Sequence, residues 1–257
     1  MMEKIYEIDF IMEKIKIYEI DFAALNPEGK SKFILDLGFL ASYCFMDCPF
    51  ETAINAQLLI FTRWWNSYRL MIPENPTPQI MDIIMEKLWD YQEGKLEPSE
   101  FTYFAKCLEA VVFEIATGST EKMDEDEAYY DFKAKYFEDW DDCYDSFLID
   151  FSYIYYGIRE HELAWSNVED IIDGDIADLK IPLLEGMEED SNCTAFAQKK
   201  WTQQIYSTPR FCQVIALLQK DIKTALEGKP MEELRKVYQN EYLFSPEDCA
   251  KVTADWY

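Results

Sequence analysis

The sequence predicts an all-α fold: one bundle of about 8–10 helices spanning 1–257 as a single domain, with mostly antiparallel neighbours. Apolar residues recur every three or four positions along most of the chain, which is the period of an amphipathic helix. Thr-Pro and Ser-Pro pairs stand where helices should begin, and glycines stand where they should end. No glycine- or serine-rich linker divides the chain, and short connections favour antiparallel packing.

The N-terminal segment 1–22 contains a short duplication. MEKI occurs at 2–5 and 12–15, and IYEIDF occurs at 5–10 and 17–22. A fold repeat would have a longer period, so we expect this segment to be peripheral. Residues 14–22 alternate lysine with isoleucine, which permits a short strand, and a helix is the alternative.

The periodic stretches begin at residue 26. The expected helices are 26–47, 52–70, 80–91, 98–115, 124–157 (one long helix or two), 193–206, 208–226, 230–242 and a short helix after Ser245. Segment 167–192 has Gly174, Pro182 and Gly186 among many acids, so we expect it to be irregular, with at most one short helix. On helix 52–70, Trp65 is expected in the core and Arg63 beside an internal carboxylate, with a functional role there as the equal alternative.

The charge of the chain is strongly negative and unevenly distributed. The net charge is −26, and residues 121–190 alone carry 23 acids against five lysines and arginines. A field of this size repels nucleic acid and anionic lipid and attracts basic partners. We therefore expect no direct nucleic-acid binding and no membrane binding. Acidity that only keeps an aromatic-rich protein dispersed is the alternative.

Acids and aromatic side chains are interleaved inside this acidic region. Aromatic anchors surrounded by carboxylates suit a basic protein partner, because rings supply contact area and acids supply steering and pairing. The predicted partner-binding residues are Glu138, Asp139, Trp140, Asp141, Asp142, Asp145, Glu169, Asp170, Asp173 and Asp175. The alternative is an amphipathic helix whose aromatic stripe, from Tyr129 to Ile154, faces the core.

The motifs of common enzyme classes are missing from the sequence. The chain has one histidine, His161, and eight glycines, and it contains no zinc-protease, phosphate-loop or nucleophile-elbow motif. We therefore predict no catalytic residues, no cofactor and no metal site. One pattern stands against this prediction: Asp141-Asp142-Cys143-Tyr144-Asp145 resembles the aspartate-rich motif of helical isoprenoid synthases. That resemblance implies a magnesium-dependent enzyme in which Asp141, Asp142 and Asp145 hold the metal.

Cysteine usage and the absence of a secretory signal place the chain in the cytoplasm. The seven cysteines are irregularly spaced, which indicates free thiols and not a disulfide framework. In character the chain is similar to the acidic, helical immunity proteins of bacteria. That similarity implies a non-catalytic, toxin-neutralising inhibitor that docks a basic partner, for example a nuclease-type toxin. An acidic scaffold module without a charged ligand is the remaining alternative.

Overall fold

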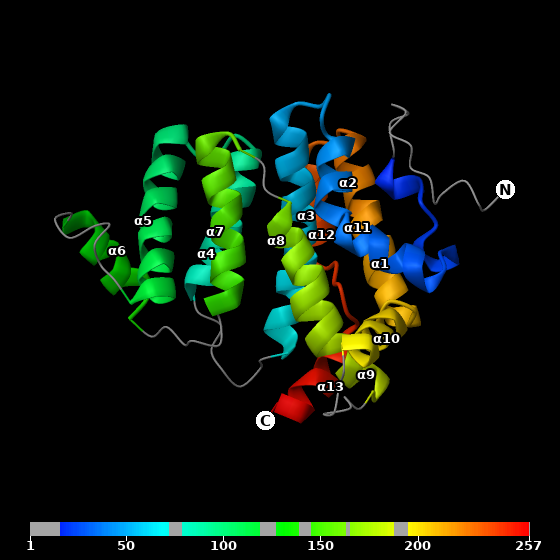
Figure 1. The fold of residues 1–257 in the computed structure, drawn as a ribbon. Helices are drawn as coiled ribbons and strands as arrows, with labels where there is room; N and C mark the ends of the chain where they lie inside the picture. The colour runs from blue at the N-terminus through cyan, green and yellow to red at the C-terminus, as the bar shows by residue number, and fades with distance from the viewer. Residues whose placement is uncertain are drawn as a thin grey trace.

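The computed structural model describes residues 16–71, 79–118, 127–138, 145–162, 165–187 and 195–256. Within these residues every regular element is a helix, as predicted (Figure 1). The α-helices are α1 (Pro27–Leu35), α2 (Leu37–Cys44), α3 (Phe50–Met71), α4 (Gln79–Gln92), α5 (Pro98–Thr117), α6 (Glu127–Tyr136), α7 (Asp145–Glu160), α8 (Ser166–Asp170), α9 (Ile181–Glu185), α10 (Ala195–Ile205), α11 (Pro209–Leu226), α12 (Met231–Tyr238) and α13 (Pro246–Trp256). Two 3-10 turns, η2 (Ile17–Glu19) and η3 (Phe22–Ala24), and a π-helix, η5 (Ile171–Lys180), complete the set.

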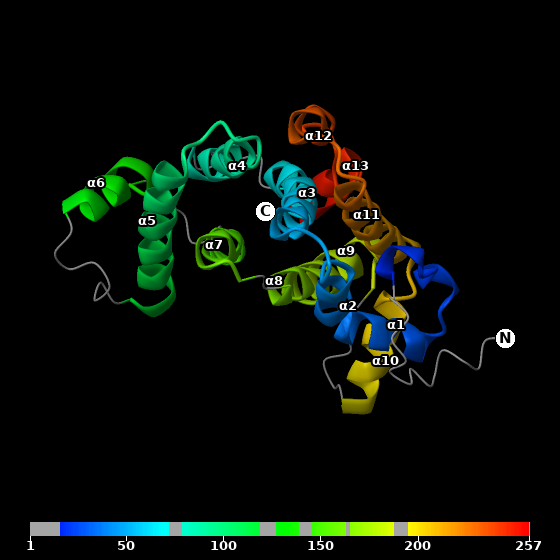
Figure 2. The same ribbon diagram turned by 90° about the horizontal axis from the view of Figure 1, so that it is seen from above.

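The central element is α3, which the other helices surround on most sides (Figure 2). Nearly all of its side chains from Ala53 to Tyr68 are buried, as expected for a helix with apolar residues on every face. It packs against α11 and α13 on one side and against α4 and α7 on the other. Trp65 lies in the core, as predicted. The α3 and α11 helices run antiparallel (Figure 1).

Helices α4 to α7 form one end of the molecule, and α1 and α10 lie at the other end (Figure 1). Within the first end, α5 and α7 pack antiparallel. Aromatic rings fill their interior: Phe101 stacks on Tyr155 with centroids 4.9 Å apart, and Phe104 meets Phe132 edge to face. Phe61 of α3 packs edge to face on Phe151 of α7, which joins this end to the central helix. The predicted aromatic stripe therefore faces the core wherever its side chains are described.

Several predicted helix boundaries are confirmed. The hydroxyl of Thr208 accepts the N–H of Phe211 at 3.2 Å, and that of Ser245 accepts the N–H of Asp248 at 3.1 Å, so both cap their helices. The predicted glycine stops all have positive φ: Gly94, Gly118 and Gly228.

The predicted helix over 26–47 is divided at Asp36 into α1 and α2. This break, and the helices found inside the acidic region, explain why the described residues hold thirteen α-helices where 8–10 were expected.

The prediction of a short N-terminal strand is wrong for the residues described. Segment 17–24 forms the turns η2 and η3 instead. The side-chain amide of Gln219 donates to the carbonyl oxygens of Ile17 (2.7 Å) and Ile20 (2.8 Å). A strand would need those carbonyls for a neighbouring strand, and α11 occupies that position. The first copy of the duplication, at 5–10, lies outside the described residues.

The prediction of an irregular segment over 167–192 is also wrong for the residues described there, 167–187. From Ser166 to Glu185 the chain is one nearly continuous run of α8, η5 and α9. Its apolar residues form a buried face that includes Ile172 and Ile176, and this burial outweighs the breakers. Pro182 has no N–H to donate, and Ile181 donates to Ile176 at the wider i to i+5 spacing. A π-helix therefore carries the chain up to the proline.

Candidate functional site

The structure describes the side chains of four of the ten predicted partner-binding residues: Glu138, Glu169, Asp170 and Asp173. The residues outside the described ranges are Asp139, Trp140, Asp141 and Asp142. Asp145 belongs to α7 and Asp175 to η5, but neither side chain is described. The aspartate-rich motif behind the isoprenoid-synthase alternative therefore stays a prediction.

The four described acids do not share one surface. Glu138 follows α6, whereas Glu169 and Asp170 lie on α8 beside α2, and Asp173 lies on η5, which continues α8. Both views place α5 and α7 between α6 and α8 (Figure 1, Figure 2). The described acids of region 121–190 are therefore divided between separate helices of the fold.

Glu138 lies in a surrounding of mixed charge. It lines a shallow, open depression of about 410 Å³ together with Tyr130, Lys133 and Phe137. The ammonium of Lys133 is 2.6 Å from the carboxylate of Glu114. A base therefore stands next to Glu138, and the depression is not a purely acidic surface.

Glu169 caps a neighbouring helix. Its carboxylate accepts the backbone N–H of Gly38 in the first turn of α2, where an N–H has no partner within its own helix. A Cβ at Gly38 would lie 2.9 Å from Glu169 Oε2, so glycine permits this approach. Burial raises the pKa of Glu169, the Gly38 N–H opposes that rise, and nearby carboxylates including Asp36 and Asp170 add to it.

Asp173 also has a structural contact, because the hydroxyl of Tyr206 donates to it and ties η5 to the end of α10. Asp170, one residue after Glu169, is exposed. Of the three acids beside α2, Asp170 is therefore the one directed most fully to solvent.

Large apolar side chains are exposed next to these acids. Leu35 is 75% exposed, Phe39 56% and Met46 63%, and the ring of Tyr43 stacks on Phe39 at 6.2 Å. Leu35 ends α1, Phe39 and Tyr43 lie one turn apart on α2, and Met46 lies in the turn after α2. We call these four residues the apolar stripe. Exposed apolar side chains gathered in this way mark interaction sites more often than single ones do.

We call this surface the α2–α8 face. Its members are Leu35, Phe39, Tyr43 and Met46 with the acids Asp36, Glu169 and Asp170. Lys32, one turn before Leu35, is exposed and adds a single base at one end. The face combines aromatic and aliphatic anchors with an acidic border.

The sequence contained a signal for the apolar half of this face. Segment 26–47 has a second apolar series at 35, 39, 43 and 46, besides the buried series that includes Phe33, Leu37 and Leu40. A helix with two apolar sides needs a second covering surface. The partner-binding prediction followed the charge and so missed this stripe.

The most connected polar cluster is buried and lies elsewhere, around Arg63. Its Nε is 3.0 and 2.9 Å from the two carboxylate oxygens of Asp221, and its Nη1 donates to Glu241. Tyr238 donates to Asp221 at 2.5 Å. Arg63 and Asp221 are each 1% exposed, so the predicted internal partner of Arg63 is confirmed.

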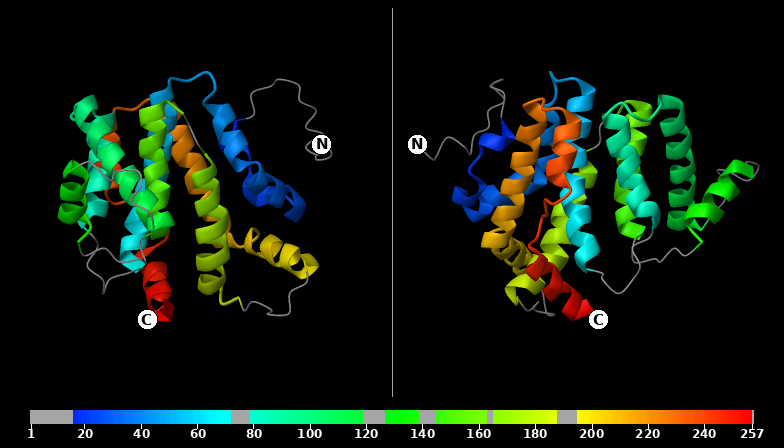
Figure 3. Two further views of the ribbon diagram at one scale, coloured as in Figure 1. Left: turned by 60° about the vertical axis from the view of Figure 1, so that its left-hand side comes forward. Right: turned by 180° about the vertical axis from the view of Figure 1, so that it is seen from behind.

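This cluster ties the segment after α12 to the central helix. The side-chain amide of Asn66 donates to the carbonyl oxygens of Tyr238 and Glu241, both at 2.9 Å. Seen from behind, α11, α12 and the segment that follows run beside α3 (Figure 3). Burial raises the pKa of Asp221 to about 6, against the opposing effects of Arg63 and Tyr238.

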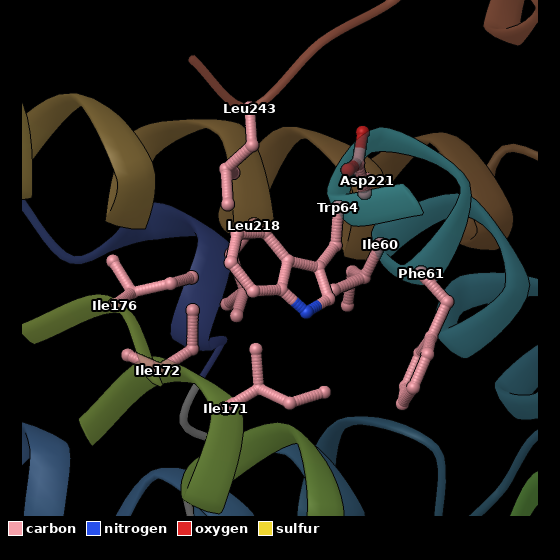
Figure 4. A pocket seen from close by; sticks show the side chains of 9 residues that line it. All are labelled: Ile60, Phe61, Trp64, Ile171, Ile172, Ile176, Leu218, Asp221 and Leu243. Carbon is pink, nitrogen blue, oxygen red and sulfur yellow. The ribbon is translucent and has the colours of Figure 1, made fainter. Parts of the chain in front are cut away.

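A small cavity beside Asp221 is too small for a substrate. It lies between Trp64 of α3, Ile172 and Ile176 of η5, and Leu218 of α11 (Figure 4). Its volume is about 10 Å³, about the space of one water molecule and far below that of a ligand site. It is a packing space at a helix junction.

Other chemistry is sparse in the described part of the chain. His161 ends α7 with φ 57° and stacks on Phe50 with centroids 4.1 Å apart. Among the described residues, no three side chains of the metal-binding types converge. None of the described helices combines the length and the apolar character needed to cross a bilayer.

No family model, curated protein or solved structure matches this chain. Its function is therefore inferred from the geometry of its surfaces and clusters.

Proposed function

We propose that this chain is a non-catalytic binding protein that docks a basic protein partner on the α2–α8 face. The supporting observation is the stripe of Leu35, Phe39 and Met46, exposed by more than half, beside the carboxylates of α8. Burying such side chains against a partner supplies affinity. The neighbouring acids supply steering toward a basic surface and select against acidic ones.

The partner class that fits best is a basic enzyme that itself binds nucleic acid, such as a nuclease-type toxin. Such an enzyme needs a positive surface to hold phosphates. A protein of net charge −26 complements that surface and covers it when bound. In this proposal the chain acts as a toxin-neutralising immunity protein by occlusion, and no bond is made or broken.

The test begins with partner capture by the tagged full-length chain in its native host. The captured protein should be basic, and its affinity for the purified chain should fall as salt rises, because screening weakens exposed charge pairs. Phe39→Asp should abolish binding. Tyr153→Asp is the matched control, because Tyr153 of α7 is 49% exposed and is not one of the residues of this face.

Circular dichroism should first show that both variants keep the helical fold. Binding that survives Phe39→Asp would remove the α2–α8 face from the proposal. Affinity that does not change with salt would contradict electrostatic docking. An acidic scaffold module predicts that neither variant alters any interaction.

A further inference from the structure

Lys30 is a buried lysine that points at a cysteine. It belongs to α1, is 5% exposed, and its ammonium lies 3.6 Å from the sulfur of Cys212 on α11. The ring of Phe22 covers the ammonium, with 5.5 Å from Nζ to the ring centroid. Cys212 itself is partly exposed.

Within the described residues, no carboxylate pairs with Lys30. Its polar contact through Nζ is the sulfur of Cys212, and the ring of Phe22 adds a cation–π contact. Lysine is almost never buried without a paired anion, because removing an ammonium from water is costly. A thiolate at Cys212 would supply that anion. As a neutral thiol, Cys212 can instead donate to the carbonyl oxygen of Tyr206 at 3.7 Å.

Burial favours the neutral thiol at two other described cysteines, Cys44 and Cys249. Burial raises the pKa of Cys44, and it raises the pKa of Cys249 to about 11. Cys48 is partly exposed like Cys212, and its sulfur faces the carbonyl oxygen of Cys44 at 3.9 Å. Cys48 therefore serves as an internal reference: the sulfurs of Cys48 and Cys212 both face a backbone carbonyl, but among the described contacts only that of Cys212 also meets an ammonium.

We propose that Cys212 is a site of oxidative and electrophilic modification, and that the ammonium of Lys30 beside its sulfur stabilises the negative charge of the reacting nucleophile. With a hydroperoxide, the thiolate sulfur attacks the terminal peroxide oxygen and forms an S–O bond while the O–O bond breaks. The sulfur is oxidised by two electrons, the peroxide is reduced, and the leaving oxygen departs as hydroxide or alkoxide and takes up a proton from water. The product is a sulfenic acid between α1 and α11, beside the docked segment 17–22.

The experiment measures the alkylation of each cysteine of the full-length protein by limiting iodoacetamide at pH 7, with quantification by peptide mass spectrometry. Cys212 should react about tenfold faster than Cys48, as expected of a thiolate beside a cation. Lys30→Met should slow Cys212 about tenfold and leave Cys48 unchanged, because methionine keeps the packing over Phe22 but removes the charge. Lys30→Arg should restore most of the rate.

The same samples treated with hydrogen peroxide and a sulfenic-acid trap should show the adduct first at Cys212. Cys212 reacting no faster than Cys48 in the wild-type chain would overturn the proposal, and that comparison does not depend on the folding of any variant. A rate at Cys212 that Lys30→Met leaves unchanged would also overturn it.

Discussion

The buried cluster around Arg63 and the exposed α2–α8 face both collect carboxylates, but under opposite conditions. At Arg63, the guanidinium and the carboxylate of Asp221 are buried, and the partly exposed Glu241 joins them from one side. A buried charge without a partner is costly. On the α2–α8 face, Asp170 is in water and close to large exposed apolar side chains. Buried, paired carboxylates such as Asp221 position helices, whereas exposed carboxylates such as Asp170 are available to a partner. The number of acids in a segment therefore does not show which acids are accessible to a partner, whereas their burial does.

The largest effect is expected at the centre of the buried cluster. Arg63→Met should lower the free energy of unfolding by about 3–5 kcal/mol, because it leaves Asp221 buried without its counter-charge. Urea denaturation followed by circular dichroism at pH 7 measures this loss. Lys236→Met is the control: it removes an exposed pair with Glu232 and should cost less than about 0.5 kcal/mol.

The double variant Arg63→Met/Asp221→Leu distinguishes a loss of charge balance from a loss of packing. It should recover most of the lost stability, because apolar groups of similar volume can replace a buried ion pair. A loss under about 1 kcal/mol for Arg63→Met alone would show that the cluster does not hold α3 and α11 together.

Local signals in the sequence predicted most of the helices but only part of the site. Apolar periodicity and the caps at Thr208 and Ser245 depend on residues a few positions apart, and the structure follows them. Over 166–185 the prediction failed, because Gly174 and Pro182 count as breakers only until tertiary burial of the apolar face is included.

Contacts between distant segments were beyond the reach of those signals. The partner of Arg63 was predicted only as some carboxylate, because Asp221 is 158 positions away. Likewise, Glu169 could not be recognised as the cap of α2, since nothing local links it to Gly38. The run of acids in the sequence predicted one acidic surface. In the fold, Glu138 follows α6 whereas Glu169 lies on α8, where it caps the start of α2.

The stability of the protein should depend on pH through the buried Asp221. The pKa of Asp221 rises from 3.8 to about 6 on burial, so protonated Asp221 is favoured in the folded state. Its contribution to stability is complete below about pH 4 and is lost as the pH rises through 6. At about 1.4 kcal/mol per pH unit, the loss amounts to about 3 kcal/mol.

The free energy of unfolding of the wild type and of Asp221→Asn is measured by chemical denaturation between pH 4 and 7.5. The difference between the two proteins at each pH gives the contribution of Asp221. The variant should gain stability relative to the wild type as the pH rises, because asparagine does not ionise. Parallel curves over the whole range would mean that Asp221 ionises as easily in the folded chain as in the unfolded chain.

The smallest effect comes from two adjacent acids on the α2–α8 face. Glu169→Ala should cost about 1 kcal/mol, since it removes the acceptor at the start of α2. Asp170→Ala should change the free energy of unfolding by less than about 0.5 kcal/mol, as expected of an exposed side chain. Binding of the partner should respond differently: Asp170→Ala should weaken it, with the loss shrinking at high salt. Equal stability losses in the two variants would contradict the cap, and unchanged binding in Asp170→Ala would confine recognition to the apolar stripe.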